Sequence, residues 1–567
     1  MKKWISFVLV LLLCCQLVTP VLAESDPAPY GRVNDRIPTI NIAGDGNAIF
    51  VPDETAEGGE RQVFYMRERE GNFDSDSGSI TSAVTSVMLP FLKEGILKNN
   101  WDPFYENLQA EVSDLFAEIQ LDKNGNAQYG TTLSGWCNWV TWYNQNNDNK
   151  GEKGYYDFDD YHFWYDWRLD PMENARTLNE YIQNVKRVTG SDKVSILSSC
   201  LGSNVALAYI AQFGTDDLYG LAIDATTANG AEFISESISG GFKLDGNAIV
   251  RFFESSNATG MFDVSDFIIA TIDLATKAGL LDGVSRLVRA TIYDKVVEGV
   301  TSALALGTMF TMPCYWACVD AAHYDEAIRY VFGEEDSEKR QEYAGLIAKL
   351  DAYHNEVACH VPELLQTTAD SGVYMAVVAK YGLQMVPLST SRNVIGDEFA
   401  SLTAASFGAT TADSIYDTLP DEYIAQRVAE GKGKYISPDK QVDASTCMFP
   451  DQTWFIKGAT HTIRTEFEDR WLYTCITADR QLTIDDCELT QFMVYDNATR
   501  VMSPMTEENC QAATTFTADR ANDEPANFFV KIKLYVKSLA KWLKLLAGVI
   551  KDKISEKING PQPDAEA

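Results

Sequence analysis

One cysteine stands where the chain has the residue pattern of a catalytic nucleophile. Residues 198–202 read Ser-Ser-Cys-Leu-Gly, between a short apolar run and a stretch of small helix-forming residues. A nucleophile elbow needs small residues two positions before and after its centre, because the backbone packs closely there and strains the central residue. Ser198 and Gly202 fill these positions, so Cys200 is predicted at the apex. A thiol there would attack an ester or activated acyl group and form a thioester.

His461 is the favoured general base for this thiol. It follows a predicted strand and Gly458, in a loop at the edge of the sheet. A neighbouring imidazole lowers the pKa of a thiol, so thiolate–imidazolium chemistry is feasible for this pair. The other histidines are weaker candidates, because they precede the elbow or fall in a helical segment: His162, His323, His354 and His360.

The segments around Cys200 alternate between strand and helix. This alternation predicts an α/β fold, with a mostly parallel sheet, right-handed crossovers and helices on both faces. The predicted strands are 36–43, 161–167, 193–197, 218–224, 382–388 and 452–457, and the helices are 171–188 and 203–213. Residues 229–380 are nearly all helical in pattern. We therefore expect a core at 24–228 and 381–526, a helical cap at 229–380 and a separate tail at 527–567.

A second block of residues indicates a family. Residues 165–168, Tyr-Asp-Trp-Arg, lie about thirty residues before the elbow and resemble a run in the lecithin:cholesterol acyltransferase family of α/β-hydrolases. Residues 38–44 are similar to the first core strand and glycine turn of that family. Residues 439–446 and 457–461 are similar to its acidic and histidine segments, so the resemblance covers most of residues 36–465.

The resemblance implies an α/β-hydrolase fold and a Cys200–Asp439–His461 triad, in the chain order nucleophile, acid, histidine. Asp439 is preferred as the acid because the residues after it fit the pattern of the family. Asp443 is an alternative, and so is Asp397, which lies closer to the preceding strand.

The backbone supplies the expected oxyanion hole. We place it at the N–H of Leu201 and at one N–H of the loop 44–47, from Asp45 or Gly46. Where the family has serine, this chain has Cys200.

Two functions from different classes are compatible with this pattern. The first is hydrolysis or transfer of an acyl group on a lipid or other amphiphilic ester through the Cys-His-Asp triad, with no metal and no organic cofactor. The second is a catalytically silent hydrolase fold with a cell-surface or membrane-binding role, in which Cys200 is a buried core residue or is disulfide-bonded.

The start of the chain predicts export. Lys2 and Lys3 precede an apolar run that ends in small residues near position 23, so residues 1–23 are expected to be a signal peptide that is removed. We expect the mature protein to be secreted or extracytoplasmic, or peripheral on the outer face of the cell membrane. Nine cysteines would remain. Cys314 with Cys318 and Cys475 with Cys487 are attractive local disulfide pairs, and the odd number favours one free thiol.

Charge separates the body of the protein from its tail. The net charge of −34 disfavours nucleic acid as a partner. Residues 528–558 are rich in lysine and predict a basic amphipathic helix with Ile532, Tyr535, Leu539 and Trp542 on its apolar side. Such a helix would dock on the acidic body of its own chain or lie on an anionic membrane surface.

Overall fold

A single large sheet organises the described part of the chain. The computed structural model of the 567-residue protein describes residues 37–44, 49–55, 59–64, 90–96, 98–115, 119–128, 161–241, 245–259, 266–277, 310–387, 389–510 and 528–559, together with 295 and 299. Within them, eight strands are ordered β12-β11-β10-β7-β6-β5-β1-β4. All neighbours are parallel except β11 and β12. The mostly parallel α/β architecture predicted from the sequence is confirmed.

The strands of this sheet are short and their buried residues are largely apolar. They are β1 (Thr39–Ile42), β4 (Tyr161–His162), β5 (Val194–Cys200), β6 (Leu218–Thr226), β7 (Tyr374–Tyr381), β10 (Thr453–Lys457), β11 (Phe492–Asp496) and β12 (Val501–Pro504). Two small antiparallel pairs lie outside it, β2 (Ile49–Pro52) with β3 (Glu60–Phe64) and β8 (Thr410–Thr411) with β9 (Val442–Asp443).

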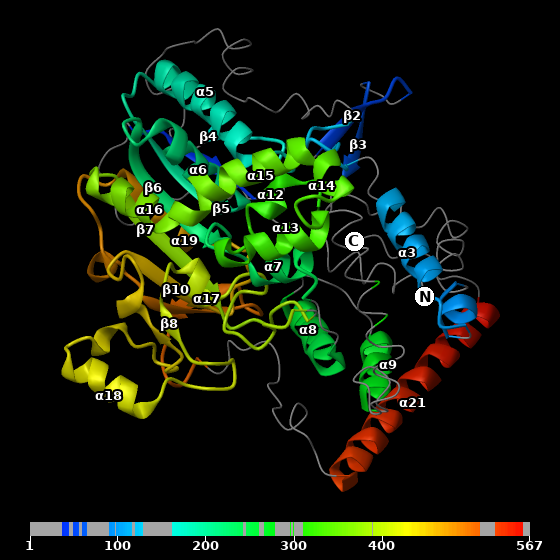
Figure 1. Ribbon diagram of the computed structural model, residues 1–567. Coiled ribbons are helices and arrows are strands. Elements are labelled where there is room, and N and C mark those ends of the chain that lie inside the picture. The colour runs from blue at the N-terminus through cyan, green and yellow to red at the C-terminus, as the bar shows by residue number, and fades with distance from the viewer. Residues whose placement is uncertain are drawn as a thin grey trace.

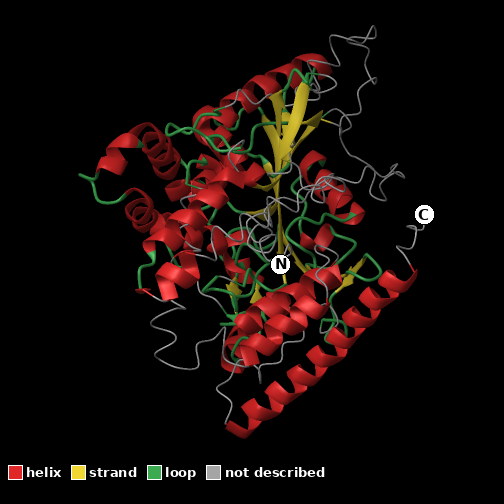
Figure 2. Ribbon diagram, turned by 90° about the vertical axis from the view of Figure 1, so that its right-hand side faces the viewer, coloured by secondary structure: helices red, strands yellow, loops and turns green. Residues whose placement is uncertain are grey.

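Helices cover both faces of the sheet, as Figures 1 and 2 show. On one face, α5 packs against α6, and on the other α19 contacts β5, β6 and β7. The close approach of α19 depends on Gly220, since a Cβ there would lie 2.4 Å from the carbonyl oxygen of Ile476. The helices before the last core strands are η1 (Phe91–Ile96), α3 (Asp102–Leu115), α5 (Pro171–Thr189), α6 (Leu201–Phe213), α7 (Glu232–Ile238), α8 (Gly246–Thr259), α9 (Asp266–Lys277), α12 (Pro313–Trp316), α13 (Tyr324–Phe332), α14 (Glu338–Glu342), α15 (Ala344–Glu356) and α16 (Val361–Asp370). The remaining helices are α17 (Leu402–Ala405), α18 (Asp421–Ala429), α19 (Glu466–Thr477) and α21 (Phe528–Asn559), and short 3-10 turns connect several elements.

Helix α5 shows how local sequence fixes an element. The Asp170 carboxylate accepts a hydrogen bond from the N–H of Met172 at 2.9 Å, which caps the first turn, and Pro171 occupies that turn. Gly190 ends the helix in a left-handed conformation with φ of 70°. The helix predicted over 171–188 therefore forms as Pro171–Thr189.

The last part of the sheet differs from the prediction. The strand expected at 382–388 lies instead at β7, Tyr374–Tyr381, inside the segment predicted to be a helical cap. Seven of its eight residues are buried, and apart from Lys380 they are apolar or aromatic, a pattern that a buried helix segment also shows. Gly382, with φ of 88°, ends the strand. In addition, β10 is not the last strand, because β11 and β12 follow it.

Helix α7 is tied to the loop that follows β7. The Glu236 carboxylate accepts hydrogen bonds from the backbone N–H and hydroxyl groups of Thr390 and Ser391. The Glu232 carboxylate accepts another from the N–H of Ser401 at 2.6 Å. Helix α7, the first helix after β6, is therefore hydrogen-bonded to the 389–401 loop.

All described cysteines are thiols. Cys314 and Cys318, expected as a local pair, lie one helical turn apart, with the Cys318 thiol near the carbonyl oxygen of Cys314 at 3.5 Å. Cys475 and Cys487 are also unbridged. Cys137 and the predicted signal peptide lie outside the described residues.

Helix α21 packs along α9, as both views of the molecule show. The Ser538 hydroxyl donates a hydrogen bond to the Asp273 carboxylate across this contact. Ser538 is the most buried side chain described on α21. The contact with α9 therefore lies to one side of the apolar face predicted from Ile532, Tyr535, Leu539 and Trp542. None of the helices in the described ranges has both the length and the hydropathy of a membrane span.

Candidate active site

Cys200 lies at the junction of β5 and α6 in a strained conformation. Its φ of 50° and ψ of −128° fall in a region that non-glycine residues rarely adopt. A Cβ on Gly202 would lie 2.2 Å from the carbonyl oxygen of Ile42, so only glycine fits there. At the other small position, the Ser198 hydroxyl donates a hydrogen bond to the carbonyl oxygen of Ala222 at 3.1 Å. This is the geometry that the small residues of the 198–202 pattern predict.

His461 lies in the 458–465 loop, between β10 and α19. Its Nδ1 lies 2.7 Å from Oδ2 of Asp397, and both side chains are buried. The ring of Phe399 packs edge-on against the imidazole, with the centroids 5.1 Å apart. The other oxygen of Asp397, Oδ1, accepts a hydrogen bond from the N–H of Ala400 at 3.0 Å. A carboxylate held in this way fixes the orientation of the ring and places the proton on Nδ1.

The second ring nitrogen of His461, Nε2, is the candidate contact for the thiol. Because Asp397 engages Nδ1, Nε2 is the nitrogen left to interact with Cys200. It is buried and lacks a hydrogen-bond partner of standard geometry within the described part of the chain. Burial lowers the pKa of the His461 imidazole, but the charges and hydrogen bonds of Asp397 and Cys200 outweigh this effect and raise it to about 10. The histidine is therefore cationic at neutral pH, and a cation beside a thiol favours the thiolate.

The end of β1 lies directly against Cys200. A Cβ on Gly44 would be 2.8 Å from Cβ of Cys200, 3.2 Å from its sulfur and 3.6 Å from the backbone nitrogen of Leu201. The Tyr165 hydroxyl supports this approach, since it donates a hydrogen bond to the carbonyl oxygen of Ala43 at 2.7 Å. Leu201, whose backbone N–H is predicted to form part of the oxyanion hole, is the first residue of α6 and follows Cys200 directly. Asp45 and Gly46, the other predicted contributors, lie outside the described residues.

The remaining residues of the 165–170 block support the same region. Asp166 pairs with Arg168 through both carboxylate oxygens, at 2.9 and 2.6 Å, and Arg168 also donates to the carbonyl oxygen of Ile119 at 2.8 Å. Arg168 is completely buried. The block therefore stabilises the chain around Cys200 and contains none of the three residues of the thiol–imidazole–carboxylate group.

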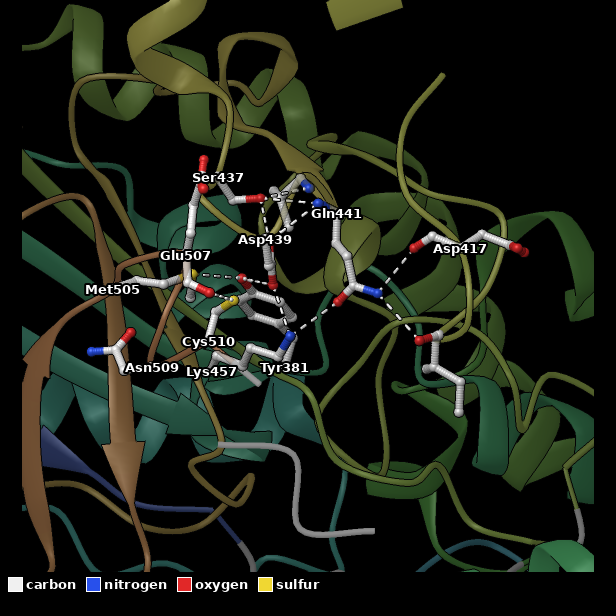
Figure 3. Close-up of polar contacts among 12 residues, drawn as sticks. Tyr381, Asp417, Ser437, Asp439, Gln441, Lys457, Met505, Glu507, Asn509 and Cys510 are labelled. Atoms are coloured by element: carbon white, nitrogen blue, oxygen red, sulfur yellow. Dashed lines mark hydrogen bonds and ion pairs between the residues drawn. The ribbon is translucent and has the colours of Figure 1, made fainter. Parts of the chain in front are cut away.

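The structure corrects the predicted acid. Asp439 lies in a different group, where it accepts hydrogen bonds from Lys457 at 2.8 Å and from the Tyr381 hydroxyl at 3.0 Å (Figure 3). The alternative Asp443 is bound to Arg427 at 2.8 Å. The carboxylate that contacts His461 is Asp397.

One signal in the sequence favoured Asp397. It follows the strand before it more closely than Asp439 does, and acids of this type of site follow strands. The fit of residues 439–446 to a family pattern led the prediction away from it.

A neighbouring carboxyl group does not compete with Asp397. Glu398 is buried, and neither of its carboxyl oxygens has a hydrogen-bond partner in the described ranges. Burial and the charge of Asp397 raise the pKa of Glu398 well above its ordinary value. Burial thus favours the neutral form of Glu398, and Asp397 is the carboxyl group that contacts the imidazole.

Comparisons with known proteins add little to this geometry. The sequence matches none of the protein-family models and none of the curated proteins. Among solved structures, it is similar to a chain described as "The crystal structure of Tle4-Tli4 complex", at 13% sequence identity and a TM-score of 0.23. The match covers 61% of this chain and 75% of the other. A similarity this low supports no argument, and the description rests on the residues themselves.

Proposed function

We propose that the protein is an α/β-hydrolase-fold enzyme that hydrolyses or transfers the acyl group of a lipid or other amphiphilic ester. Cys200 attacks, His461 moves the proton and Asp397 orients the imidazole. The observation that carries this proposal is that a cysteine lies in a strained strand-to-helix turn, while a buried histidine, whose pKa that cysteine helps to raise, has its Nδ1 2.7 Å from a buried carboxylate. The resemblance of residues 165–168 to the lecithin:cholesterol acyltransferase family supports the lipid class of substrate.

The steps follow from the charges of these groups. The Cys200 thiolate adds to the ester carbonyl carbon, and the N–H of Leu201 donates to the oxyanion that forms. Nε2 of the His461 imidazolium then donates its proton to the leaving alkoxide, which leaves a thioester and a neutral imidazole. The imidazole removes a proton from water or from an acceptor alcohol, which attacks the thioester. Collapse of the second oxyanion releases an acid or a new ester and restores the thiolate.

Alkylation of the thiol tests this proposal without a known substrate. Cys359 is exposed, and its sulfur lies 3.4 Å from Nε2 of His354, so it would also react. The experiment therefore uses a Cys359→Ser background and reads each cysteine by peptide mass spectrometry after treatment with iodoacetamide at pH 7.

We expect Cys200 to be labelled and His461→Gln to slow the labelling by about tenfold or more, because the imidazolium no longer favours the thiolate. We also expect Cys200→Ala to abolish hydrolysis of a p-nitrophenyl acyl ester. An unlabelled Cys200, with ester hydrolysis unchanged by Cys200→Ala, would leave the silent hydrolase fold as the better description.

We further propose that the protein is exported and that α21 holds it on an anionic membrane surface. Only one side of α21 packs on α9. Ile532, Val536 and Leu543 are 45%, 55% and 52% exposed, and their spacing places them on one side of the helix. Exposed lysines follow one edge of this stripe, at 533, 537 and 544. An apolar stripe with flanking lysines is complementary to anionic lipid headgroups over acyl chains.

Vesicle flotation separates this role from a purely structural one. The triple variant Ile532→Ser, Val536→Ser and Leu543→Ser removes the stripe and leaves Ser538 on α9. We expect it to lose binding to vesicles that contain phosphatidylglycerol, while Val428→Ser, at a 59% exposed position on α18, retains it. Equal binding by wild type and triple variant would rule out the stripe as the contact. Self-association of the wild type that the triple variant lacks would identify a second copy as its partner.

A further inference from the structure

The last two residues of β7 reach the two ends of the loop that carries His461. Neighbouring residues of a strand point to opposite faces of a sheet, so Lys380 and Tyr381 project to different sides. The 458–465 loop begins after Lys457 and ends at the Thr465 cap of α19. Each end of the loop has a buried lysine bound to carboxylates, and β7 contributes to both groups.

The first group holds the start of the loop (Figure 3). Nζ of Lys457 donates to Oδ2 of Asp439 at 2.8 Å, and the same oxygen accepts from the Tyr381 hydroxyl at 3.0 Å. The Ser437 hydroxyl binds the other carboxylate oxygen at 2.5 Å. Lys457 is 5% exposed and Asp439 is 8% exposed. The N–H of Gly458, the first loop residue, donates to the carbonyl oxygen of Tyr381 at 2.8 Å.

The second group holds the end of the loop. Nζ of Lys380 donates to the carbonyl oxygen of Ile463 at 2.7 Å, two residues after His461. The same nitrogen lies 2.9 Å from Asp224 and 3.2 Å from Glu468. Lys380 is completely buried, and it donates hydrogen bonds to Asp224 and to the Ile463 carbonyl and forms an ion pair with Glu468. Glu468 in turn forms a capping box with Thr465, which ends the loop.

Stability alone does not explain these two groups. Replacing a buried ion pair with apolar residues of similar volume often leaves a protein equally stable, whereas its hydrogen bonds fix geometry closely. A catalytic histidine depends on such geometry, because a displacement of about 1 Å reduces a rate by about a hundredfold. A loop held at both ends by buried, ion-paired lysines meets that requirement.

We propose that Lys457 with Asp439, and Lys380 with Asp224 and Glu468, are positioning residues that hold Nε2 of His461 against the sulfur of Cys200. The proposal rests on the thiol–imidazole chemistry inferred above. It assigns Asp439 a role in the site that is different from that of a triad acid, because Asp439 acts through Lys457 and the loop backbone.

A double variant tests the first group without leaving an unpaired charge. Asp439→Leu with Lys457→Met replaces the ion pair with apolar side chains. The matched control is Asp443→Leu with Arg427→Met, which removes another ion pair, 2.8 Å long, from the same part of the chain and leaves the 458–465 loop unchanged. Tyr381→Phe, which removes one hydroxyl and keeps the ring, provides a second variant if the double variant fails to fold.

Two measurements are made on each protein: the rate of Cys200 alkylation from pH 6 to 9, and the pKa of His461 from the NMR signals of its ring. We expect the double variant to slow Cys200 alkylation at pH 7 by about tenfold, since a displaced imidazolium stabilises the thiolate less. Its pH profile should approach that of an isolated thiol, and the pKa of His461 should fall. The control should alkylate within about twofold of the wild type, because substitutions away from the site rarely disturb its geometry. For Tyr381→Phe, we expect smaller shifts in the same directions.

A folded double variant with the wild-type alkylation profile and the wild-type His461 pKa would overturn the positioning role, and so would an unchanged Tyr381→Phe if the double variant does not fold. Failure of the proposed function gives a different result. In that case Cys200 would be unreactive, or insensitive to His461→Gln, in the otherwise unaltered protein. The NMR pKa of His461 would still decide the positioning role, because it reports the contact with Asp397.

Discussion

Nδ1 of His461 lies 2.7 Å from the carboxylate of Asp397, 64 residues earlier in the chain. The two residues come from the loops that follow neighbouring strands, β10 and β7, and parallel strands bring such loops to the same edge of the sheet. The pairing therefore follows from the order of the strands. It brings a carboxylate to Nδ1 of the imidazole and leaves Nε2 for the thiol.

Replacing this carboxylate should impair the site more than any other acid substitution in the loops. We expect Asp397→Asn to reduce acyl-ester turnover by about 10²–10⁴-fold, because an amide neither stabilises the imidazolium nor fixes its tautomer. Steady-state hydrolysis of a p-nitrophenyl ester measures the change. Asp443→Asn is the control, since Asp443 binds Arg427 and should leave turnover within about twofold of the wild type. Equal loss in both variants would contradict the assignment of Asp397.

The ionisation of His461 should depend on Cys200. The pKa of the imidazole is raised to about 10 by Asp397 and Cys200 against the opposing effect of burial. We expect its ring signals to show no titration between pH 6 and 8 in the wild type and a lower pKa in Cys200→Ala, where one anionic neighbour is absent. Heteronuclear NMR of isotope-labelled histidine measures the pKa of His461 in both proteins. Titration of His461 near its ordinary pKa in the wild type would show that the thiol and imidazole do not interact.

The same raised pKa makes stability depend on pH. A histidine whose pKa is higher in the folded state contributes stability that is complete below about pH 6.5 and is lost as the pH rises through about 10. In the thiolate–imidazolium pair the folded state holds one proton, and so does the unfolded chain, on the thiol, between about pH 6.5 and 8.5, so the two effects cancel there. The free energy of unfolding of the wild type should therefore decline from about pH 8.5 to 10. Urea titrations at each pH should show a smaller decline for His461→Gln, which has no such proton to lose.

Asp170 should produce a pH effect in a lower range. Burial is the main cause that raises the pKa of this capping carboxyl to about 6, although the N–H of Met172 opposes it. Ionisation is thus harder in the folded state, and the contribution of the neutral carboxyl is lost as the pH rises from about 4 to 6. Asp170→Asn keeps a capping oxygen and cannot ionise. We expect the free energy of unfolding of Asp170→Asn to rise by up to about 3 kcal/mol relative to the wild type as the pH rises from about 4 to 6. Urea titrations at each pH measure this difference. Parallel plots of the free energy of unfolding against pH for the two proteins would contradict the burial effect.

Gly202 should not tolerate even one methyl group. A Cβ would meet the carbonyl oxygens of Ile42 and Ala43 at 2.2 and 2.8 Å, and both belong to backbone that cannot move easily. We expect Gly202→Ala to lower the free energy of unfolding by about 1–3 kcal/mol. In Gly241→Ala the nearest atoms lie 3.4 Å away, in Glu236, so thermal denaturation should show a much smaller effect.

The sequence predicted the elements with strong local signals. The helix at 171–189 has a cap, a proline and a terminal glycine, and the small residues around Cys200 restrict the turn to one geometry. These features depend on neighbours in sequence, so they can be recognised without a structure.

Features set by distant contacts were missed. Strand β7 is almost entirely buried and, apart from Lys380, is made of apolar and aromatic residues, and its identity as a strand depends on the strands beside it. Asp439 and Asp397 both lie in loops between the same two strands, β7 and β10, and the residue that reaches His461 is decided by the path of the chain between them. The side of α21 that faces α9 likewise depends on a partner helix more than 250 residues away.

The two edges of the sheet share a property that concerns self-association. Within the described residues, β4 has two residues at one edge, and at the other edge β12 has four, runs antiparallel and ends at Pro504. An exposed strand edge can recruit another chain through its free N–H and C=O groups, and short strands and proline prevent this. In a protein at high local concentration on a surface, these edges would disfavour the strand-to-strand growth that leads to aggregates.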